Sequence, residues 1–156
     1  MKLVVQRVSE AYVALDGSPT GSIGRGLVVF LCVEKGDDRA LADHYASKIV
    51  EMRIFNDEEG KMNRSIKEVG GEILLISQFT LAADAEKGRR PSFDRAERPE
   101  IAEELYRYFA RKVDYEGVPV VMGVFAAHMK IGLVNDGPVT IILGKDYARK
   151  VQEDLK

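Results

Sequence analysis

The chain has 156 residues, 46% of them hydrophobic and 31% charged, which predicts one globular domain with its own core and excludes an intrinsically disordered protein. The 23 Lys and Arg residues nearly balance the 25 Asp and Glu residues, for a formal net charge of −2. A uniformly basic nucleic-acid coat is therefore excluded, and any contact with RNA or DNA needs a local patch.

The first part of the chain has the pattern of strands. Residues 3–8 are rich in β-branched side chains and predict one strand, and residues 13–15 predict a second, short one. Turn residues follow at 16–19. The continuous apolar run at 26–33 is typical of a central strand that is buried on both faces.

Two segments have the spacing of amphipathic helices. The first begins at Asp38, whose carboxylate can accept hydrogen bonds from unpaired backbone N–H groups, and apolar residues recur every three or four positions after it. The second begins at Pro99, whose missing N–H costs nothing in a first turn, and ends at Gly117. A third, short helix is predicted for residues 145–156.

The remaining apolar segments predict strands. They follow a polar turn at 56–60 and lie at 72–79, 118–124, 130–134 and 139–143. The total of about six to eight strands and two to three helices does not alternate strictly. This count disfavours a doubly wound parallel sheet and favours a single α+β domain, with the helices packed on a curled or barrel-like mixed sheet.

Polar residues stand where the predicted apolar strand 73–76 ends. Ser77, Gln78 and Thr80 flank Phe79 there, and an emerging strand end can aim backbone N–H groups at a developing oxyanion. A threonine at such a place can also act as a nucleophile if a base lies nearby. Polar residues at an ordinary strand exit are the alternative interpretation.

A basic segment follows. Lys87, Arg89 and Arg90 stand close together, with Arg95 and Arg98 behind them, and such a group can bind phosphates. A solvated loop is the alternative, because acidic residues are interleaved with these cations.

The segment Asn135–Thr140 lies between two predicted strands and consists largely of turn residues. A plain turn is therefore one interpretation. The Gly137–Pro138 bond in this segment is of the one type that adopts the cis form with appreciable frequency.

The single cysteine, Cys32, lies in a predicted buried strand, which indicates an inert thiol and excludes an intramolecular disulfide. The two histidines, His44 and His128, have no metal-ligand spacing. The early charges in the sequence do not fit a signal peptide, and no apolar run approaches the ~18–20 residues that span a bilayer. We therefore predict a soluble cytoplasmic protein with no metal, no cofactor and no membrane partner.

Seven short segments together resemble the D-aminoacyl-tRNA deacylase family, also called D-tyrosyl-tRNA deacylases. They are Val4–Val8, Val33–Asp37, Arg53–Phe55, Gly60–Asn63, Ser77–Leu81, Arg90–Phe93 and Asn135–Thr140. The similarity covers about residues 1–143, and it predicts a deacylase domain at 1–144 with residues 145–156 as a helical tail of the same domain. This chain has His128 where the family pattern usually has an Asp, so we do not assign His128 a catalytic role.

The resemblance implies a homodimer with a barrel-like core that hydrolyses the ester between a D-amino acid, or glycine, and the 3′-terminal adenosine of tRNA. It further implies that a cis Gly137–Pro138 bond is presented to the partner's active site, where it rejects L-aminoacyl groups. Met129 and Arg7 are expected at this chiral selection site. Arg7 would hold the Gly–Pro loop, although a surface salt bridge is an alternative for that residue.

Two mechanisms remain open for the catalytic segment Ser77–Thr80. Either the Thr80 hydroxyl attacks the ester, or the 2′-hydroxyl of the tRNA adenosine helps to activate water while backbone N–H groups near Gln78 and Phe79 hold the oxyanion. We favour the second, since no base for Thr80 is found near it in the sequence. Lys87, Arg89 and Arg90 are expected to contact tRNA phosphates, and no DNA partner is expected. The other classes considered are a non-catalytic RNA-binding module and an esterase for small molecules.

Overall fold

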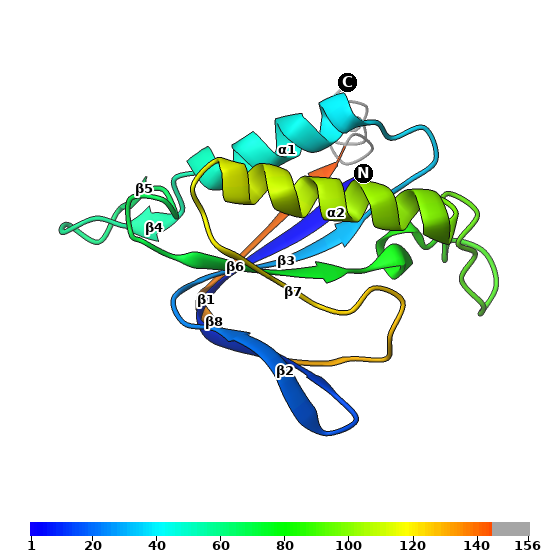
Figure 1. Cartoon of the computed structure of the whole chain (residues 1–156), viewed down its shortest axis with the longest axis horizontal. Coiled ribbons are helices and arrows are strands. Elements are labelled where there is room, and N and C mark those ends of the chain that lie inside the picture. Colours follow the sequence, from blue (N-terminus) through cyan, green and yellow to red (C-terminus); the bar gives the residue numbers. More distant parts are fainter. Residues whose placement is uncertain (145–156) are drawn as a thin grey trace.

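A computed structural model describes residues 1–144 and has the predicted α+β architecture (Figure 1). A strongly curled mixed sheet carries two α-helices side by side on one face. The strands are β1 (Lys2–Leu15), β2 (Ser18–Ile23), β3 (Gly26–Cys32), β4 (Phe55–Asn56), β5 (Met62–Arg64), β6 (Glu72–Ser77), β7 (Val120–Met122) and β8 (Lys130–Gly144). The helices are α1 (Arg39–Glu51), α2 (Pro99–Tyr115) and a short 3-10 helix, η1 (Phe79–Ala82).

The long strand β1 organises the sheet. One edge of β1 pairs antiparallel with β3 and then with β2, and the other edge pairs antiparallel with β8. On the far side of β3 the direction changes, because β3, β6 and β7 are parallel to one another. The carboxyl ends of these three parallel strands therefore meet at one edge of the sheet, where open α/β sheets place their ligands.

The sheet curls until β2 lies over β7. A Cβ atom added to Gly21 of β2 would come within 2.6 Å of the Val121 side chain of β7, which shows how closely the two strands approach. Apolar side chains from the concave face fill the space between them, and the buried members are Val8, Ala11, Val13, Ile23, Val28, Leu74 and Ile76. This closure gives the nearly closed, barrel-like sheet that the pattern predicted.

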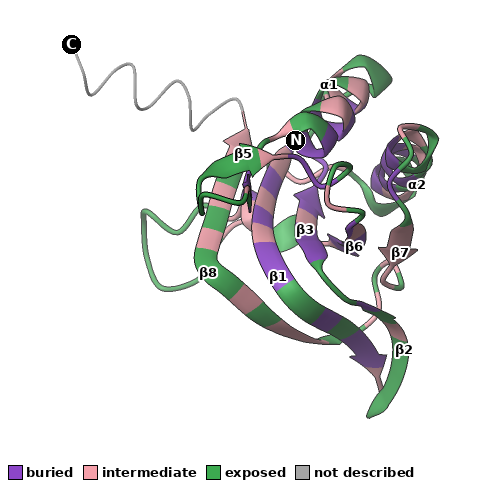
Figure 2. Ribbon diagram, turned by 90° about the vertical axis from the view of Figure 1, so that its left-hand side faces the viewer, coloured by how far each residue is buried: buried purple, intermediate pink, exposed green. Residues whose placement is uncertain are grey.

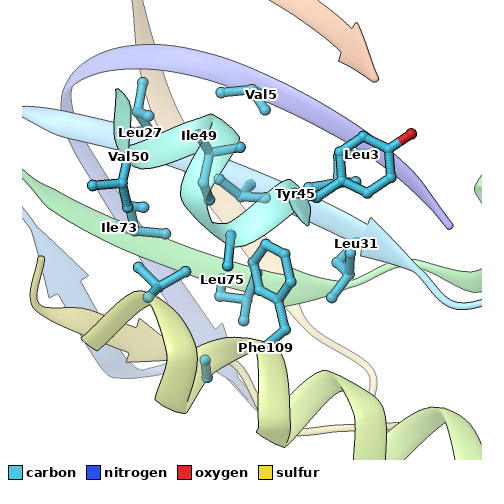
Figure 3. Packing of buried hydrophobic residues seen from close by; sticks show 14 of the residues in the cluster. Leu3, Val5, Leu27, Leu31, Tyr45, Ile49, Val50, Ile73, Leu75 and Phe109 are labelled. Carbon is cyan, nitrogen blue, oxygen red and sulfur yellow. The ribbon is translucent and has the colours of Figure 1, made fainter. Parts of the chain in front are cut away.

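The second and larger core lies between the sheet and the helices (Figure 3). Helix α1 begins as predicted at Asp38, whose carboxylate accepts a hydrogen bond of 2.8 Å from the backbone N–H of Leu41. Helix α2 begins with Pro99 and buries Tyr106 and Phe109 completely against the sheet. Pro99 in its first turn explains why the helix begins there, and its apolar face explains why it packs on the sheet.

Three details of the predicted pattern are wrong. Residues 3–8 and 13–15 belong to the single strand β1, and residues 18–23, which include predicted turn residues, form β2. The two strands predicted at 130–134 and 139–143 are one strand, β8, and the segment Asn135–Thr140 is a bulge in it, because it lies opposite only Gln6 to Val8 of β1. Pairing along the whole of β1 outweighs the local turn preferences.

Two further predictions concern the ends of elements. The predicted strand at 72–79 ends at Ser77, where the 3-10 helix η1 takes over from Phe79. The helix predicted for residues 145–156 lies outside the described residues. No helix within residues 1–144 is long and apolar enough to span a membrane.

Candidate active site at the sheet end

A cavity of about 610 Å³ opens at the carboxyl ends of β3, β6 and β7. Its size is in the usual range for sites that bind small molecules or cofactors. The lining residues come from these strand ends, from the first turns of α2 and from the segment that follows β7. They are Leu31, Val33, residues 76–79, Phe93, Ala96, Glu97, Pro99, Ala102, Tyr106, residues 125–129 and Ile131.

The predicted catalytic segment forms one wall of this cavity. Ser77, Gln78 and Phe79 line it, and the chain turns from β6 into η1 at this point. The backbone N–H of Gln78 donates to the carbonyl of Leu31 at 2.8 Å, so it is not free to bind an oxyanion. The next two N–H groups, of Phe79 and Thr80, open the 3-10 helix and have no acceptor inside it. The expected oxyanion donors are therefore Phe79 and Thr80, and the expectation for the N–H of Gln78 is wrong.

The hydroxyl of Thr80 has an amide neighbour. It accepts a hydrogen bond of 2.6 Å from Nε2 of Gln78, and an amide cannot take up a proton as a general base would. The thiol of Cys32 is the other nucleophile nearby, within 3.6 Å of the carbonyl of Phe79. Burial raises the pKa of Cys32 to about 11, so the thiol stays protonated and unreactive near neutral pH.

The guanidinium of Arg7 holds the bulge that contains Gly137 and Pro138. Its Nε donates to the carbonyl of Asp136 at 2.8 Å, and its Nη1 donates to the carbonyl of Ile54 at 2.7 Å and to Oδ1 of Asn56 at 3.2 Å. The residue is 7% exposed, and these bonds replace the water that the guanidinium has lost. Its Nε also lies 3.9 Å from Oδ2 of Asp136, so an ion pair with an exposed carboxylate is present beside the buried hydrogen bonds. Arg7 thereby joins the bulge of β8 to strand β4.

The bulge is also fixed from within. Oδ1 of Asn135 accepts a hydrogen bond of 2.9 Å from the backbone N–H of Val139, and its Nδ2 donates to the hydroxyl of Thr140 at 2.9 Å. Together these two bonds span the Gly137–Pro138 peptide bond, which is cis. Gly137 has a φ of +142°, and a Cβ at this position would meet the Val139 side chain at 2.8 Å.

The structure does not bring all of the predicted site residues together. Met129 lines the cavity, whereas Gly137 and Pro138 are exposed on β8 and are not among the described residues that line it. Lys87, Arg89 and Arg90 are exposed in a loop beside the cavity whose ends are joined by two hydrogen bonds between the backbones of Asp84 and Ser92. Within residues 1–144, no group of three or more His, Cys, Asp or Glu side chains could hold a metal ion.

Several cavity residues were missed by the sequence analysis. Tyr106 and the segment 125–127 line the cavity but carry no motif of their own, and Phe93 was named only as the last residue of the Arg90–Phe93 segment, with no role assigned to it. Tyr106 donates from its hydroxyl to the carbonyl of Leu75 at 2.8 Å, and burial raises the pKa of Tyr106. A signal existed for Phe93 alone, which ends the Arg90–Phe93 segment and lies three residues after Arg90.

Comparisons with known proteins agree with one another. The profile of the family described as D-Tyr-tRNA(Tyr) deacylase matches residues 4–144. A protein of Geotalea daltonii named D-aminoacyl-tRNA deacylase is 57% identical over 143 residues, which cover 92% of this chain and 95% of that protein. A protein of Symbiobacterium thermophilum with the same name is 53% identical over 146 residues, which cover 94% of this chain and 97% of that protein.

Two solved structures have the same fold. The structure titled c-Myc DNA Unwinding Element Binding Protein has a TM-score of 0.88 at 39% identity and covers 93% of this chain and 99% of its own. The structure titled as a probable eukaryotic D-amino acid tRNA deacylase has a TM-score of 0.77 at 17% identity, covers 91% of this chain and 97% of its own, and supports the fold alone.

The fold, the cavity and these relatives define a hydrolase that acts on ester bonds. The chain belongs to the D-Tyr-tRNA(Tyr) deacylase family, as the sequence motifs predicted.

Proposed function

We propose that the protein hydrolyses the ester bond of D-aminoacyl-tRNA and of mischarged glycyl-tRNA, and releases the free amino acid and tRNA. The observation that carries this proposal is the cavity at the sheet end together with the backbone N–H groups of Phe79, which lines it, and of the adjacent Thr80, neither of which has an acceptor inside η1. Such a pair suits the oxyanion of an acyl-transfer reaction. The names of the relatives from Geotalea daltonii and Symbiobacterium thermophilum supply the substrate class.

The selection of D-aminoacyl groups is assigned to Gly137 and Pro138 of a partner subunit. These two residues are exposed on β8, whose outer edge pairs with no strand among residues 1–144. Figure 2 shows that much of β8 is exposed. Three large apolar side chains of this face are half exposed, namely Tyr12, Val134 and Ile142. An open edge with such side chains suits a second copy of the chain, so each cavity would receive the bulge of the other subunit.

Rejection of L-aminoacyl groups then follows from the fixed position of the bulge. Arg7 and Asn135 hold its backbone, so its carbonyl groups can accept from the α-amino group of the substrate and leave no room for an L side chain. Met129 adds apolar lining to the cavity. Glycine has no side chain to reject, so glycyl-tRNA is a substrate.

The reaction requires no enzyme nucleophile. A water molecule, activated with the help of the 2′-hydroxyl of the terminal adenosine, attacks the ester carbonyl carbon, and the oxyanion binds the N–H groups of Phe79 and Thr80. The bond between this carbon and the 3′-oxygen breaks, and the 3′-oxygen takes the proton that the water loses. The amide neighbour of the Thr80 hydroxyl supports this route over attack by Thr80.

The loop between Asp84 and Ser92 supplies cations that can bind the tRNA partner. Lys87, Arg89 and Arg90 stand on this loop beside the cavity, and their charge suits the phosphates of the substrate's 3′ end. A tRNA substrate also suits the predicted cytoplasmic location. The expectation of no DNA partner stays a prediction.

The first test is a paired deacylation assay with D-tyrosyl-, L-tyrosyl- and glycyl-tRNA. We expect hydrolysis of the D and glycyl substrates and a kcat/KM for the L substrate that is lower by at least about 100-fold, since a rejected substrate leaves polar groups unpaired. Equal rates for D and L would contradict chiral selection. Binding without turnover would favour an RNA-binding module, and hydrolysis of free amino-acid esters at a similar rate would favour a small-molecule esterase.

A second test separates the two mechanisms through Thr80→Val. This change removes the hydroxyl, keeps the branched shape and leaves the backbone N–H in place, so kcat should stay within about threefold of the wild-type value. A nucleophilic Thr80 would instead lose on the order of 10³-fold or more in kcat. The matched measurement uses a tRNA that ends in 2′-deoxyadenosine, and a normal rate on this substrate would disprove the 2′-hydroxyl route.

A further inference from the structure

Two aromatic rings stand unusually exposed at the mouth of the cavity. Phe79 is 58% exposed and Phe93 is 37% exposed, and both line the cavity. Their ring centroids are 5.1 Å apart with an angle of 67° between the planes, which is an edge-to-face contact. The rings therefore support each other and still present apolar surface to solvent.

Neither the oxyanion site nor the core explains the ring of Phe93. The ring contributes no hydrogen-bonding group, and the residue belongs to neither of the two buried clusters or their packed neighbours. Phenylalanine is ordinarily buried, so an exposed pair at the mouth of a cavity indicates a surface that is covered when a ligand binds.

Positive charge lies next to this ring. The loop that carries Lys87, Arg89 and Arg90 is closed at its base by backbone hydrogen bonds of 2.8 and 2.9 Å between Asp84 and Ser92, and Phe93 follows Ser92 directly. An exposed ring beside a group of cations is the combination with which proteins bind single-stranded nucleic acid. The bases stack on the ring and the cations follow the backbone.

We propose that Phe93 is a stacking platform for the unpaired base that precedes the terminal adenosine of the substrate. This inference rests on the proposed function, since it requires the 3′ end of a tRNA to enter the cavity beside Phe79. The base next in the strand then lies against the exposed face of Phe93, and its phosphate faces the cation-bearing loop. Phe93 is thus a positioning residue, which touches the substrate away from the reacting ester.

Kinetics of Phe93→Leu test the stacking interaction. Base stacking on an aromatic ring contributes about 1–3 kcal/mol, so the KM for D-tyrosyl-tRNA should rise at least about fivefold while kcat changes little. The rise should be much smaller for D-tyrosyl-adenosine, which has no preceding base. Phe93→Tyr keeps the ring and should restore the wild-type KM for the tRNA substrate.

The same KM measurements on Phe93→Leu can also contradict the stacking interaction. An equal rise in KM on both substrates would mean that Phe93 only shapes the cavity, and an unchanged KM for the tRNA would remove the platform. Either result overturns the inference and leaves the proposed function intact, because that function is tested by the wild-type protein alone.

A second measurement needs no turnover, because the chain contains no tryptophan. Phe93→Trp introduces the chain's single tryptophan at the platform, which can be excited apart from the six tyrosines, and stacking of a base should quench it when a short single-stranded RNA ending in CCA is added. The matched control is Tyr115→Trp, at an 85% exposed position at the far end of α2, which should respond little. Equal quenching of both variants, or quenching of Phe93→Trp by duplex DNA as strong as by the RNA, would contradict the proposal.

Discussion

Arg7→Met should lower the ratio of D- to L-tyrosyl-tRNA hydrolysis by at least about tenfold, which corresponds to about 1.4 kcal/mol of lost discrimination. Methionine fills a similar length but donates no hydrogen bond, so the carbonyl groups of Asp136 and Ile54 lose their partner. The bulge that carries Gly137 and Pro138 then loses its tie to β4, and its carbonyl groups no longer hold the one position that the proposed chiral selection requires. The measurement is kcat/KM for both substrates.

The same substitution should also reduce stability. The carbonyl of Ile54 is bonded to Arg7 in a buried environment, and an unsatisfied buried acceptor costs about 1–3 kcal/mol. The carbonyl of Asp136 belongs to an exposed residue, and water can replace its lost bond at little cost. We therefore expect a loss of about 2 kcal/mol in the free energy of unfolding, and a variant that is still folded at 25 °C.

Two further variants make the Arg7 result specific. Arg107→Met removes a guanidinium whose side chain is 57% exposed and pairs with Glu103 on one helix surface, so it should change neither the D-to-L ratio nor stability by more than about 0.5 kcal/mol. Asn56→Ala removes only one acceptor of Arg7 and should have an intermediate effect. A wild-type D-to-L ratio in a folded Arg7→Met protein of unchanged solution mass would rule out the proposed role of Arg7.

The sequence predicted best those elements whose pattern is local. The run at 26–33 became β3, buried almost throughout, and the starts of both helices follow from Asp38 and Pro99. The sequence predicted the bounds of strands worst where their pairing partners lie far along the chain. The residues at 18–19 and 135–140 have turn chemistry, yet β1 pairs with both segments and they belong to β2 and β8, whereas Asp16 and Gly17 do form the predicted turn. Local preference is weak compared with a ladder of hydrogen bonds to β1.

The candidate site shows the same division. The segment Ser77–Thr80 could be located because an apolar strand ends there, and the cavity does lie against it. The partners of Arg7 could not be found, because Ile54 and Asn56 come near it only through the packing of β4 against the bulge. The hydrogen bond from the N–H of Gln78 to the carbonyl of Leu31 likewise depends on the parallel pairing of β3 with β6, which no sequence pattern predicts.

Among glycine-to-alanine changes in the described part of the chain, Gly26→Ala should lower the free energy of unfolding most. Gly26 begins β3 and lies opposite Glu72 at the start of the parallel pairing with β6. A Cβ at this position would lie 1.9 Å from the carbonyl oxygen of Glu72 and 2.9 Å from its carbonyl carbon. These are backbone atoms, so no rotamer change relieves the clash, and the two strands must separate at this end.

The separation of β3 from β6 reaches the candidate active site, because the pairing of these two strands ends at Leu31 and Ser77, which line the cavity. We expect a loss of about 3 kcal/mol or more in the free energy of unfolding, which for a domain of this size lowers Tm by roughly 6–12 °C. Circular dichroism melting at equal protein concentration measures it, and deacylase activity should fall together with Tm.

Gly24→Ala is the matched control, two residues earlier in the same turn. A Cβ at Gly24 would meet nothing within 4 Å, and the backbone there has no positive φ. This variant should lose no stability and can gain up to about 1 kcal/mol, because alanine restricts the unfolded chain. If Gly26→Ala melted at the same temperature as Gly24→Ala, the close approach of β3 to Glu72 would not exist in solution. The parallel pairing that places Ser77 beside Leu31 would then have to be revised.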